Sequence, residues 1–463
     1  MVNESKNLAA DSPEAPLPLA PVPARAAVRR RLPLVGLGRG GWVNLALAAL
    51  AVFYVLLFAF WVYQVGLFRY VGSDFRAVWA AAEVGRDNGF ARIYDLSLLA
   101  DHERQLFSMY PDNGPGMAFA VVPMPYLPVF VLPFLPLLPL GPTLGFAVWT
   151  VANLVLITLY FVRLTWAFRS AGPRRLVLPL LVLAWPVYLT LFFGQVNLLP
   201  LVGVGEFVLS LRRRRPWLAG LWLALLLIKP QLLIVLLPGL LLARQRNALL
   251  GFAVAAVAVG GGSIYMLGLD GVRDLASLVS GYVAGMPTNT PQHMMNWRSL
   301  WLNIGGSLQP EMEWAVVGVG MLLCAGAALW LWWHGDLAGD KRLSAMLLAT
   351  LAATDTVAWD SHMHMALATV PALLFAVASG ALPAWLATTW LVLPAVVMAA
   401  ALFTIGNPMT YAALLLFGLT VLLQFWATVA FARSRQKLPL APDVDTYSSS
   451  MPSEPSASEG GSQ

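Results

Sequence analysis

Long apolar runs separated by short polar stretches make up most of this chain. The runs are continuous rather than alternating, which predicts helices that span a bilayer and excludes the strands of a membrane barrel. Of the 463 residues, 59% are hydrophobic and 11% are charged, whereas a soluble domain carries roughly 25% charged residues. We therefore expect an all-α polytopic membrane protein.

Lys and Arg residues cluster in short stretches between the apolar runs, which is the pattern of cytoplasmic loops under the positive-inside rule. Arginines before the first expected span, at about 43–68, predict a cytoplasmic N-terminus and an external stretch at about 69–117. Further spans are expected at about 144–168, 176–193, a short run ending at Arg212, 216–229, 231–243, 247–267, 314–334, 343–359, 363–379, 384–404 and 408–431. The prediction is about twelve crossings with both termini in the cytoplasm.

Seven prolines between Val121 and Pro142 exclude a regular helix there. A full crossing would also place the basic loop after residue 168 outside. We expect a broken, re-entrant or interfacial segment that stays on the external side, because protein or a cavity can cover such backbone. Residues 1–41 and 434–463 lack apolar runs and are predicted to be disordered cytoplasmic tails around a membrane domain at 42–433.

Unusual polar residues gather on the side that the charge rule places outside, although the rule used none of them. Because they lie far apart in the chain, their common side predicts a functional site. The candidates are Asp74, Gln195, Asn197, Lys229, Arg298, His362 and His364.

Asp74 opens a segment in which Phe75, Val78, Trp79 and Ala82 follow helical spacing. This pattern predicts an amphipathic helix lying on the membrane, with Trp79 at the depth of the lipid headgroups. Asp74 then has two interpretations: an acid that caps the start of the helix, or a general base at the border between water and lipid.

Lys229 separates two apolar half-spans of about 13 residues each, and Pro230 indicates that the helix breaks there. The turn is therefore expected to open into a cavity. A lysine at such depth is a functional candidate, here for binding a phosphate as a point charge. The alternative is a lysine that snorkels to the interface.

The remaining candidates also have two interpretations each. Gln195 and Asn197 at a hairpin tip either cap backbone groups or bind sugar hydroxyls. His362 and His364 would diverge on a helix, which argues against a two-histidine metal site, but one of them can face a cavity with Asp360 beside it. Arg298 is either a phosphate or sugar ligand or an exposed loop arginine.

Other chemistry is missing from the sequence. The single cysteine, Cys324, lies in an apolar run, so neither a disulfide within the chain nor a thiolate metal site is possible. We find no Walker motif, no Rossmann glycine pattern and no nucleophile elbow. We therefore expect no cofactor, no metal and no nucleic-acid partner.

Several motifs in this order resemble glycosyltransferase family 87, over about residues 70–430. The motifs are Asp74-Phe75, Tyr94-Asp95, the proline-rich segment, Gly194-Gln195-Val196-Asn197, Ala219-Gly220 followed by Ile228-Lys229-Pro230-Gln231, and Ser361-His362-Met363-His364 before Pro371. Met124-Pro125-Tyr126 stands where the family often has a double proline. The resemblance implies a GT-C-type bundle and inverting transfer of mannose from a polyprenyl phosphate. It places the reaction outside the cytoplasmic membrane, with no nucleotide sugar and no required metal.

Within that resemblance, Asp74 would take the proton of the acceptor hydroxyl, and Lys229, with Arg298 or a histidine, would neutralise the leaving phosphate. A glycolipid or a glycan is the expected acceptor. A rival function is that of a transporter or lipid flippase, since intramembrane charges and broken helices occur there too. The long first external loop and the lack of a convincing inverted repeat favour the transferase.

Overall fold

The computed structural model describes residues 39–114, 116–168, 174–283, 290–304, 310–335, 339–402 and 407–436. Most of these residues are helical, which confirms the all-α prediction. Within this part of the chain, β-structure is limited to isolated bridges, Leu67 with Val71 and Met294 with His362. Residues from Asn44 onward form one compact unit, and the fold below is that of this unit.

The first half of the chain forms α1 (Arg39–Val65), α2 (Ser73–Asp87), η1 (Phe90–Arg92), α3 (Leu96–Ser108), η2 (Pro128–Phe130), η3 (Leu132–Leu140), α4 (Pro142–Phe168), α5 (Arg174–Val182), α6 (Trp185–Phe193), α7 (Leu198–Arg212) and α8 (Pro216–Leu223), where η marks a 3-10 helix. The second half forms η4 (Ala224–Ile228), η5 (Pro230–Leu233), α9 (Leu236–Leu242), α10 (Arg246–Val283), η6 (Pro291–His293), α11 (Trp297–Ile304), α12 (Pro310–His334), α13 (Asp340–Val357), η7 (Met363–Thr369), α14 (Val370–Ala378), α15 (Ala384–Ala401) and α16 (Pro408–Gln436).

Seven helices of the described residues are long and apolar enough to cross a bilayer, which indicates a multi-pass membrane protein. The expected count of about twelve crossings is not confirmed. The remaining expected crossings coincide with α7, α8–η4, η5–α9, α13 and η7–α14. Four of these have fewer than 18 residues, and α13 carries Asp340, Lys341, Arg342 and Asp355. Several of them are also interrupted by 3-10 turns.

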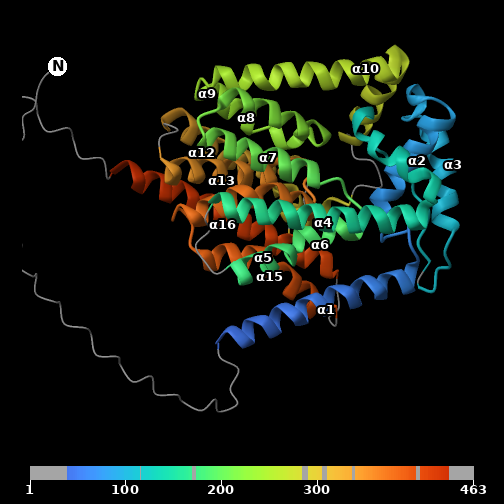
Figure 1. Cartoon of the computed structure of the whole chain (residues 1–463), viewed down its shortest axis with the longest axis horizontal. Coiled ribbons are helices and arrows are strands. Elements are labelled where there is room, and N and C mark those ends of the chain that lie inside the picture. Colours follow the sequence, from blue (N-terminus) through green and yellow to red (C-terminus); the bar gives the residue numbers. More distant parts are fainter. Residues whose placement is uncertain are drawn as a thin grey trace, which may run out of the picture. The chain divides into compact units, whose positions relative to one another are not determined.

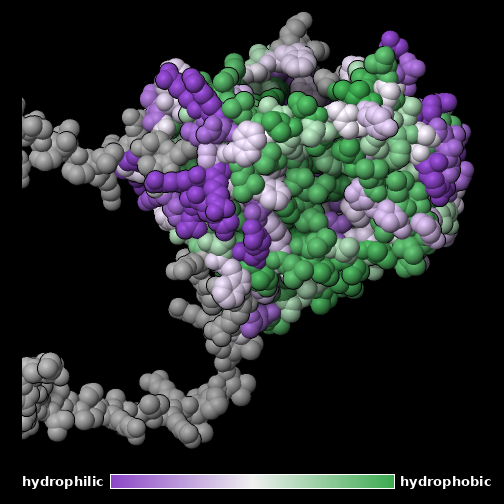
Figure 2. Space-filling model, turned by 45° about the horizontal axis from the view of Figure 1, so that its top comes forward, coloured by the Kyte–Doolittle hydropathy of each residue, from purple (hydrophilic) through white to green (hydrophobic). Residues whose placement is uncertain are grey.

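Loops that the charge pattern predicts on one side do meet in the structure. Arg212 binds Asp340 at 3.0 Å and donates to the carbonyl of Ala167 at 2.9 Å. Arg342 likewise donates to the carbonyl of Ser434 at 3.1 Å. These contacts lie at the end of the bundle opposite α2 and α3 (Figure 1). Figure 2 shows hydrophilic residues gathered toward two ends of one face with hydrophobic residues between them, as expected for a bundle in a bilayer.

The proline-rich segment forms the short 3-10 helices η2 and η3 rather than a crossing. At its start, the Val122 amide donates to Glu103 of α3 at 3.0 Å. Just beyond its end, Thr143 contacts the hydroxyl of Tyr110 at 2.6 Å. The segment therefore begins and ends at the same end of the bundle, as predicted.

Helix α2 is a correction to the expected surface helix. Ten of its residues are buried, and Trp79 is only 1% exposed. Gly145 of α4 leaves room for this ring, since a Cβ there would lie 2.4 Å from it. The apolar spacing was right, but η3, α3 and α4 cover the helix where lipid was expected. The pattern alone does not tell a protein partner from a lipid one.

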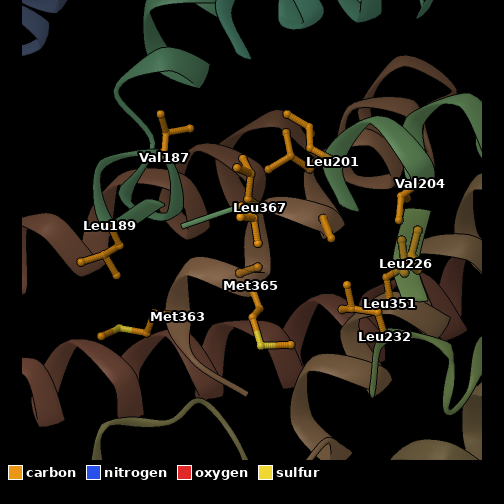
Figure 3. Close-up of a cluster of buried hydrophobic side chains, with 14 of the residues drawn as sticks. Val187, Leu189, Leu201, Val204, Leu226, Leu232, Leu351, Met363, Met365 and Leu367 are labelled. Atoms are coloured by element: carbon orange, nitrogen blue, oxygen red, sulfur yellow. The ribbon is translucent and has the colours of Figure 1, made fainter. Parts of the chain in front are cut away.

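The core of the unit surrounds η7, which is buried throughout. Figure 3 shows Met365 and Leu367 of η7 among Leu201 and Val204 of α7, Leu226 of η4, Leu232 of η5 and Leu351 of α13. This apolar packing fixes the position of η7. The histidines at its start are held in place as a result.

Candidate active site

A cavity of about 680 Å³ lies at the end of the bundle that carries α2 and α3. Its walls come from α2, the turn after α6, the junction of η4 and η5, and the start of η7. Five predicted site residues line it together: Asp74, Gln195, Lys229, His362 and His364. Segments that are far apart in the sequence are thus brought to one place.

The turn after α6 joins the two sides of the cavity. Helix α6 ends at Gly194, whose φ of 73° is in the left-handed region. Trp149 donates to the Gly194 carbonyl at 3.0 Å, and the Gly72 amide donates to Phe192 at 2.9 Å. A Cβ on Gly194 would lie 2.5 Å from the Cβ of Phe75. Glycine therefore allows this turn to approach α2 and brings Gln195 to Asp74.

Gln195 connects the acid and the lysine of the site. Its amide Nε2 donates to the Asp74 carboxylate, and its Oε1 accepts from Lys229 Nζ at 3.0 Å. Asp74 does not cap its helix, because the N-cap of α2 is Gly72 and no side-chain bond caps that end. The carboxylate of Asp74 is directed to the cavity instead.

Lys229 is 4% exposed, so it does not snorkel to an interface. It lies between η4 and η5 with φ −137° and ψ 74°, a helix break that Pro230 enforces. Its ammonium also contacts Nε2 of His364 at 3.2 Å. Because an ammonium only donates, this nitrogen of His364 must accept.

His362 and His364 both face the cavity, whereas the helical spacing predicted that they diverge. The backbone at His362 is extended, with φ −78° and ψ 149°. Residues two apart in extended chain share a face, and the two rings stack with centroids 5.3 Å apart. His362 also pairs with Asp360 at 3.0 Å.

Two predicted residues lie outside the lining of this cavity. Asn197 is buried and donates to Thr190 and to the carbonyl of His364, each at 3.1 Å. It therefore anchors η7 to the turn after α6. Arg298 pairs with Glu313 at 3.3 Å and lies 4.1 Å over the Trp359 ring, on α11 rather than in an exposed loop.

The sequence interpretation missed a buried ion pair beside Asp74. Arg76 donates to Glu103 at 2.9 Å and to the carbonyls of Phe68 and Ala120 at 2.7 and 3.0 Å. The two side chains are 2% and 0% exposed. Burial raises the pKa of Glu103 to about 7, although the charge of Arg76 opposes this. The apolar spacing of α2 gave no signal for this pair, because Arg76 lies on the side of the helix that also carries Glu83 and Asp87.

Burial has the largest effect on the pKa of Asp74. It raises the pKa of the Asp74 carboxyl, while the charges of Lys229 and His362 and the bond from Gln195 oppose the rise. For His362, burial lowers the pKa but the pairing with Asp360 outweighs it, so the pKa is raised overall. Among the described residues, no group of three or more His, Cys, Asp or Glu side chains is placed to hold a metal ion.

An acid and a cation that share one amide thus line one cavity of the helical bundle. Residues 125–354 match the model of glycosyltransferase family 87. The match confirms the resemblance that the motifs predicted and indicates a glycosyltransferase. It contains Gln195 and Lys229, while Asp74 precedes it and His362 and His364 follow it.

Comparison with the curated proteins gives no significant match. The solved structures give none either.

Proposed function

We propose that this protein transfers a hexose, with mannose as the first candidate, from a polyprenyl phosphate to a hydroxyl of a glycolipid or glycan acceptor. The reaction would take place at the external face of the cytoplasmic membrane and invert the anomeric centre. One observation carries the proposal: Asp74 and Lys229 line one cavity and bind opposite ends of Gln195.

Asp74 is the proposed general base. It takes the proton of the acceptor hydroxyl while the oxygen bonds to the anomeric carbon. The pKa that burial raises makes Asp74 a stronger base than an exposed carboxylate, which suits this step. A single base on the face opposite the leaving group is what inversion requires, whereas retention needs a nucleophilic carboxylate as well.

Lys229 is the proposed ligand of the donor phosphate. As the bond between the anomeric carbon and the phosphate oxygen breaks, the electron pair leaves with the polyprenyl phosphate. A fixed ammonium beside that oxygen stabilises the charge as it develops. His364 touches Lys229, and His362 stacks on His364, so both belong to the same part of the proposed site.

The test is a transfer assay with purified protein. The protein is incubated with radiolabelled polyprenyl phosphate sugars, including mannose and glucose, and with membrane lipid extract, and the labelled products are identified. Transfer to an acceptor that depends on the lipid-linked donor supports the proposal. Movement of the donor across vesicles without any new glycosidic product would contradict it and favour a flippase.

The proposed orientation has a separate test. In a Cys324→Ser background, a cysteine at exposed Thr290 should react with an impermeant thiol reagent added outside intact cells. Cysteines at exposed Arg213 or Lys341 should react only after the membrane is made permeable. The reverse labelling pattern would place the cavity on the cytoplasmic side.

A further inference from the structure

Gln195 has a geometry that sugar binding does not require. Its amide nitrogen can only donate and its amide oxygen can only accept. The carboxylate of Asp74 only accepts, and the ammonium of Lys229 only donates. The two partners therefore force one orientation on the amide, and both of its ends are engaged before any substrate is present.

The position of Gln195 is also set from the backbone. The backbone amide of Gln195 donates to the carbonyl of Thr190 at 2.9 Å. Gln195 also follows Gly194, which permits the close approach of this turn to Phe75. The side chain is 5% exposed. A protein that buries an amide this deeply loses stability if either polar end of the amide is left without a partner. The contacts of Gln195 with Asp74 and Lys229 therefore stabilise the folded protein.

The charges around this amide would attract one another if it were absent. Within the described part of the chain, Asp74 and Lys229 do not form an ion pair with each other, because Gln195 lies between them. A carboxylate that pairs directly with an ammonium is a poorer base, and an ammonium so paired is a poorer phosphate ligand.

We propose that Gln195 is a positioning residue that keeps Asp74 and Lys229 one amide apart, so that the base and the cation stay separately available. The inference rests on the proposed function for its catalytic consequence, but the separation itself concerns only contacts of the protein. Gln195 orients the carboxylate toward the acceptor side and leaves the remaining ammonium protons for the donor phosphate.

Removal of this amide has a defined sign. With methionine at position 195, Lys229 can approach Asp74 and pair with it directly, and such a pair lowers the pKa of the carboxyl. The loss of the bond from Gln195 acts in the opposite direction, but the charge of Lys229 has the larger influence on Asp74 of the two. The other groups that act on Asp74 are unchanged by the substitution: His362 across the cavity, Arg76 on the same helix, and Glu103 and Tyr126 from the segments packed against it.

The experiment compares Gln195→Met with Gln424→Met. Methionine keeps the shape of the side chain and removes both hydrogen bonds. Gln424 is a matched control, because it is 4% exposed on α16 and donates at 2.6 Å to the carbonyl of Cys324. Both variants are checked for thermal unfolding in detergent, and each is then measured in two ways.

The first measurement needs no transfer activity. Dicyclohexylcarbodiimide reacts with protonated buried carboxyls, so its labelling of Asp74 is followed by mass spectrometry across pH. The pH of half-labelling should fall in Gln195→Met and stay unchanged in Gln424→Met. If Gln195→Met fails to fold, Gln195→Ala serves instead: it also removes both bonds and lets Lys229 pair with Asp74, so the same fall is expected.

The second measurement is transfer kinetics. For Gln195→Met, kcat should fall about 10- to 100-fold, the effect of one hydrogen bond to a charged group, because both the base and the cation act on the transition state. An unshifted or raised labelling pH overturns the inference whether or not transfer is detected. A raised donor KM with normal kcat and unshifted labelling would make Gln195 a sugar ligand. If the wild type transfers no sugar but the Asp74 labelling pH still shifts in Gln195→Met as described, the proposed function is refuted. The inference that Gln195 separates Asp74 from Lys229 then still holds.

Discussion

Substitution of Gly194 by alanine tests whether the turn after α6 must approach α2 as closely as it does. The backbone φ of 73° is strained for any residue with a side chain. The added Cβ would also lie 2.5 Å from the Cβ of Phe75 and 3.0 Å from the ring of Phe146. Gly380 provides the matched control, because its φ is 72° and no atom lies within 4 Å of a Cβ placed there.

The two substitutions separate the cost of the backbone from the cost of the contact. Alanine at a left-handed position costs about 1–2 kcal/mol. That is the whole effect expected for Gly380→Ala. An extra methyl in a packed interior costs about 1–3 kcal/mol more. Gly194→Ala should therefore lose about 2–5 kcal/mol of the free energy of unfolding, and the turn that carries Gln195 should move away from Asp74.

The assays are equilibrium unfolding in sodium dodecyl sulfate and transfer by the folded variants. Gly194→Ala should be the less stable of the two and should transfer sugar more slowly than wild type. Gly380→Ala should transfer at the wild-type rate. Equal stability and equal transfer of the two variants would refute the argument that this close approach positions Gln195.

Four further predictions concern the charged groups. Asp74→Asn should fold but lose about 10²–10⁴-fold in transfer rate. Full activity of Asp74→Asn would exclude Asp74 as the base. In the wild type, transfer should fall as the pH drops through the pKa of Asp74, which burial raises, because a protonated carboxyl takes no proton. Lys229→Arg should keep part of the activity and Lys229→Met little, through weaker donor saturation or lower turnover; normal donor kinetics in Lys229→Met would contradict the phosphate role. Arg76→Met should cost about 3–5 kcal/mol in detergent unfolding, because Glu103 loses its buried partner, and adding Glu103→Leu should recover part of that loss; an unchanged single variant would show that the pair does not stabilise the fold.

Much of the site was predictable because the charge of the loops decides which end of the bundle each turn occupies. That rule groups Asp74, Gln195, Lys229 and the two histidines without any knowledge of their contacts. The helix break at Lys229 was predictable as well, because Pro230 restricts the residue before it.

Other features depend on packing that a single sequence does not express. The apolar face of α2 carries the same signal whether lipid or η3 covers it, so Trp79 was expected at the membrane surface. The histidines were expected to diverge because helical spacing was assumed where the backbone at His362 is extended. Arg298 faces Glu313 rather than the cavity, and the spacing of a loop does not say which side chains turn inward.

The contacts of the site also have a consequence for biosynthesis. Asp74 and Gln195 are 121 residues apart, and Lys229 and His364 are 135 residues apart. A ribosome releases the chain from its N-terminus, so Lys229 and Asn197 reach the translocon well before the η7 segment exists. Until that segment inserts, Lys229 lacks His364, and Asn197 lacks the carbonyl of that residue. The set of contacts around Lys229 is therefore complete only late in insertion, and a chain that stops before residue 364 leaves Lys229 and Asn197 without these partners.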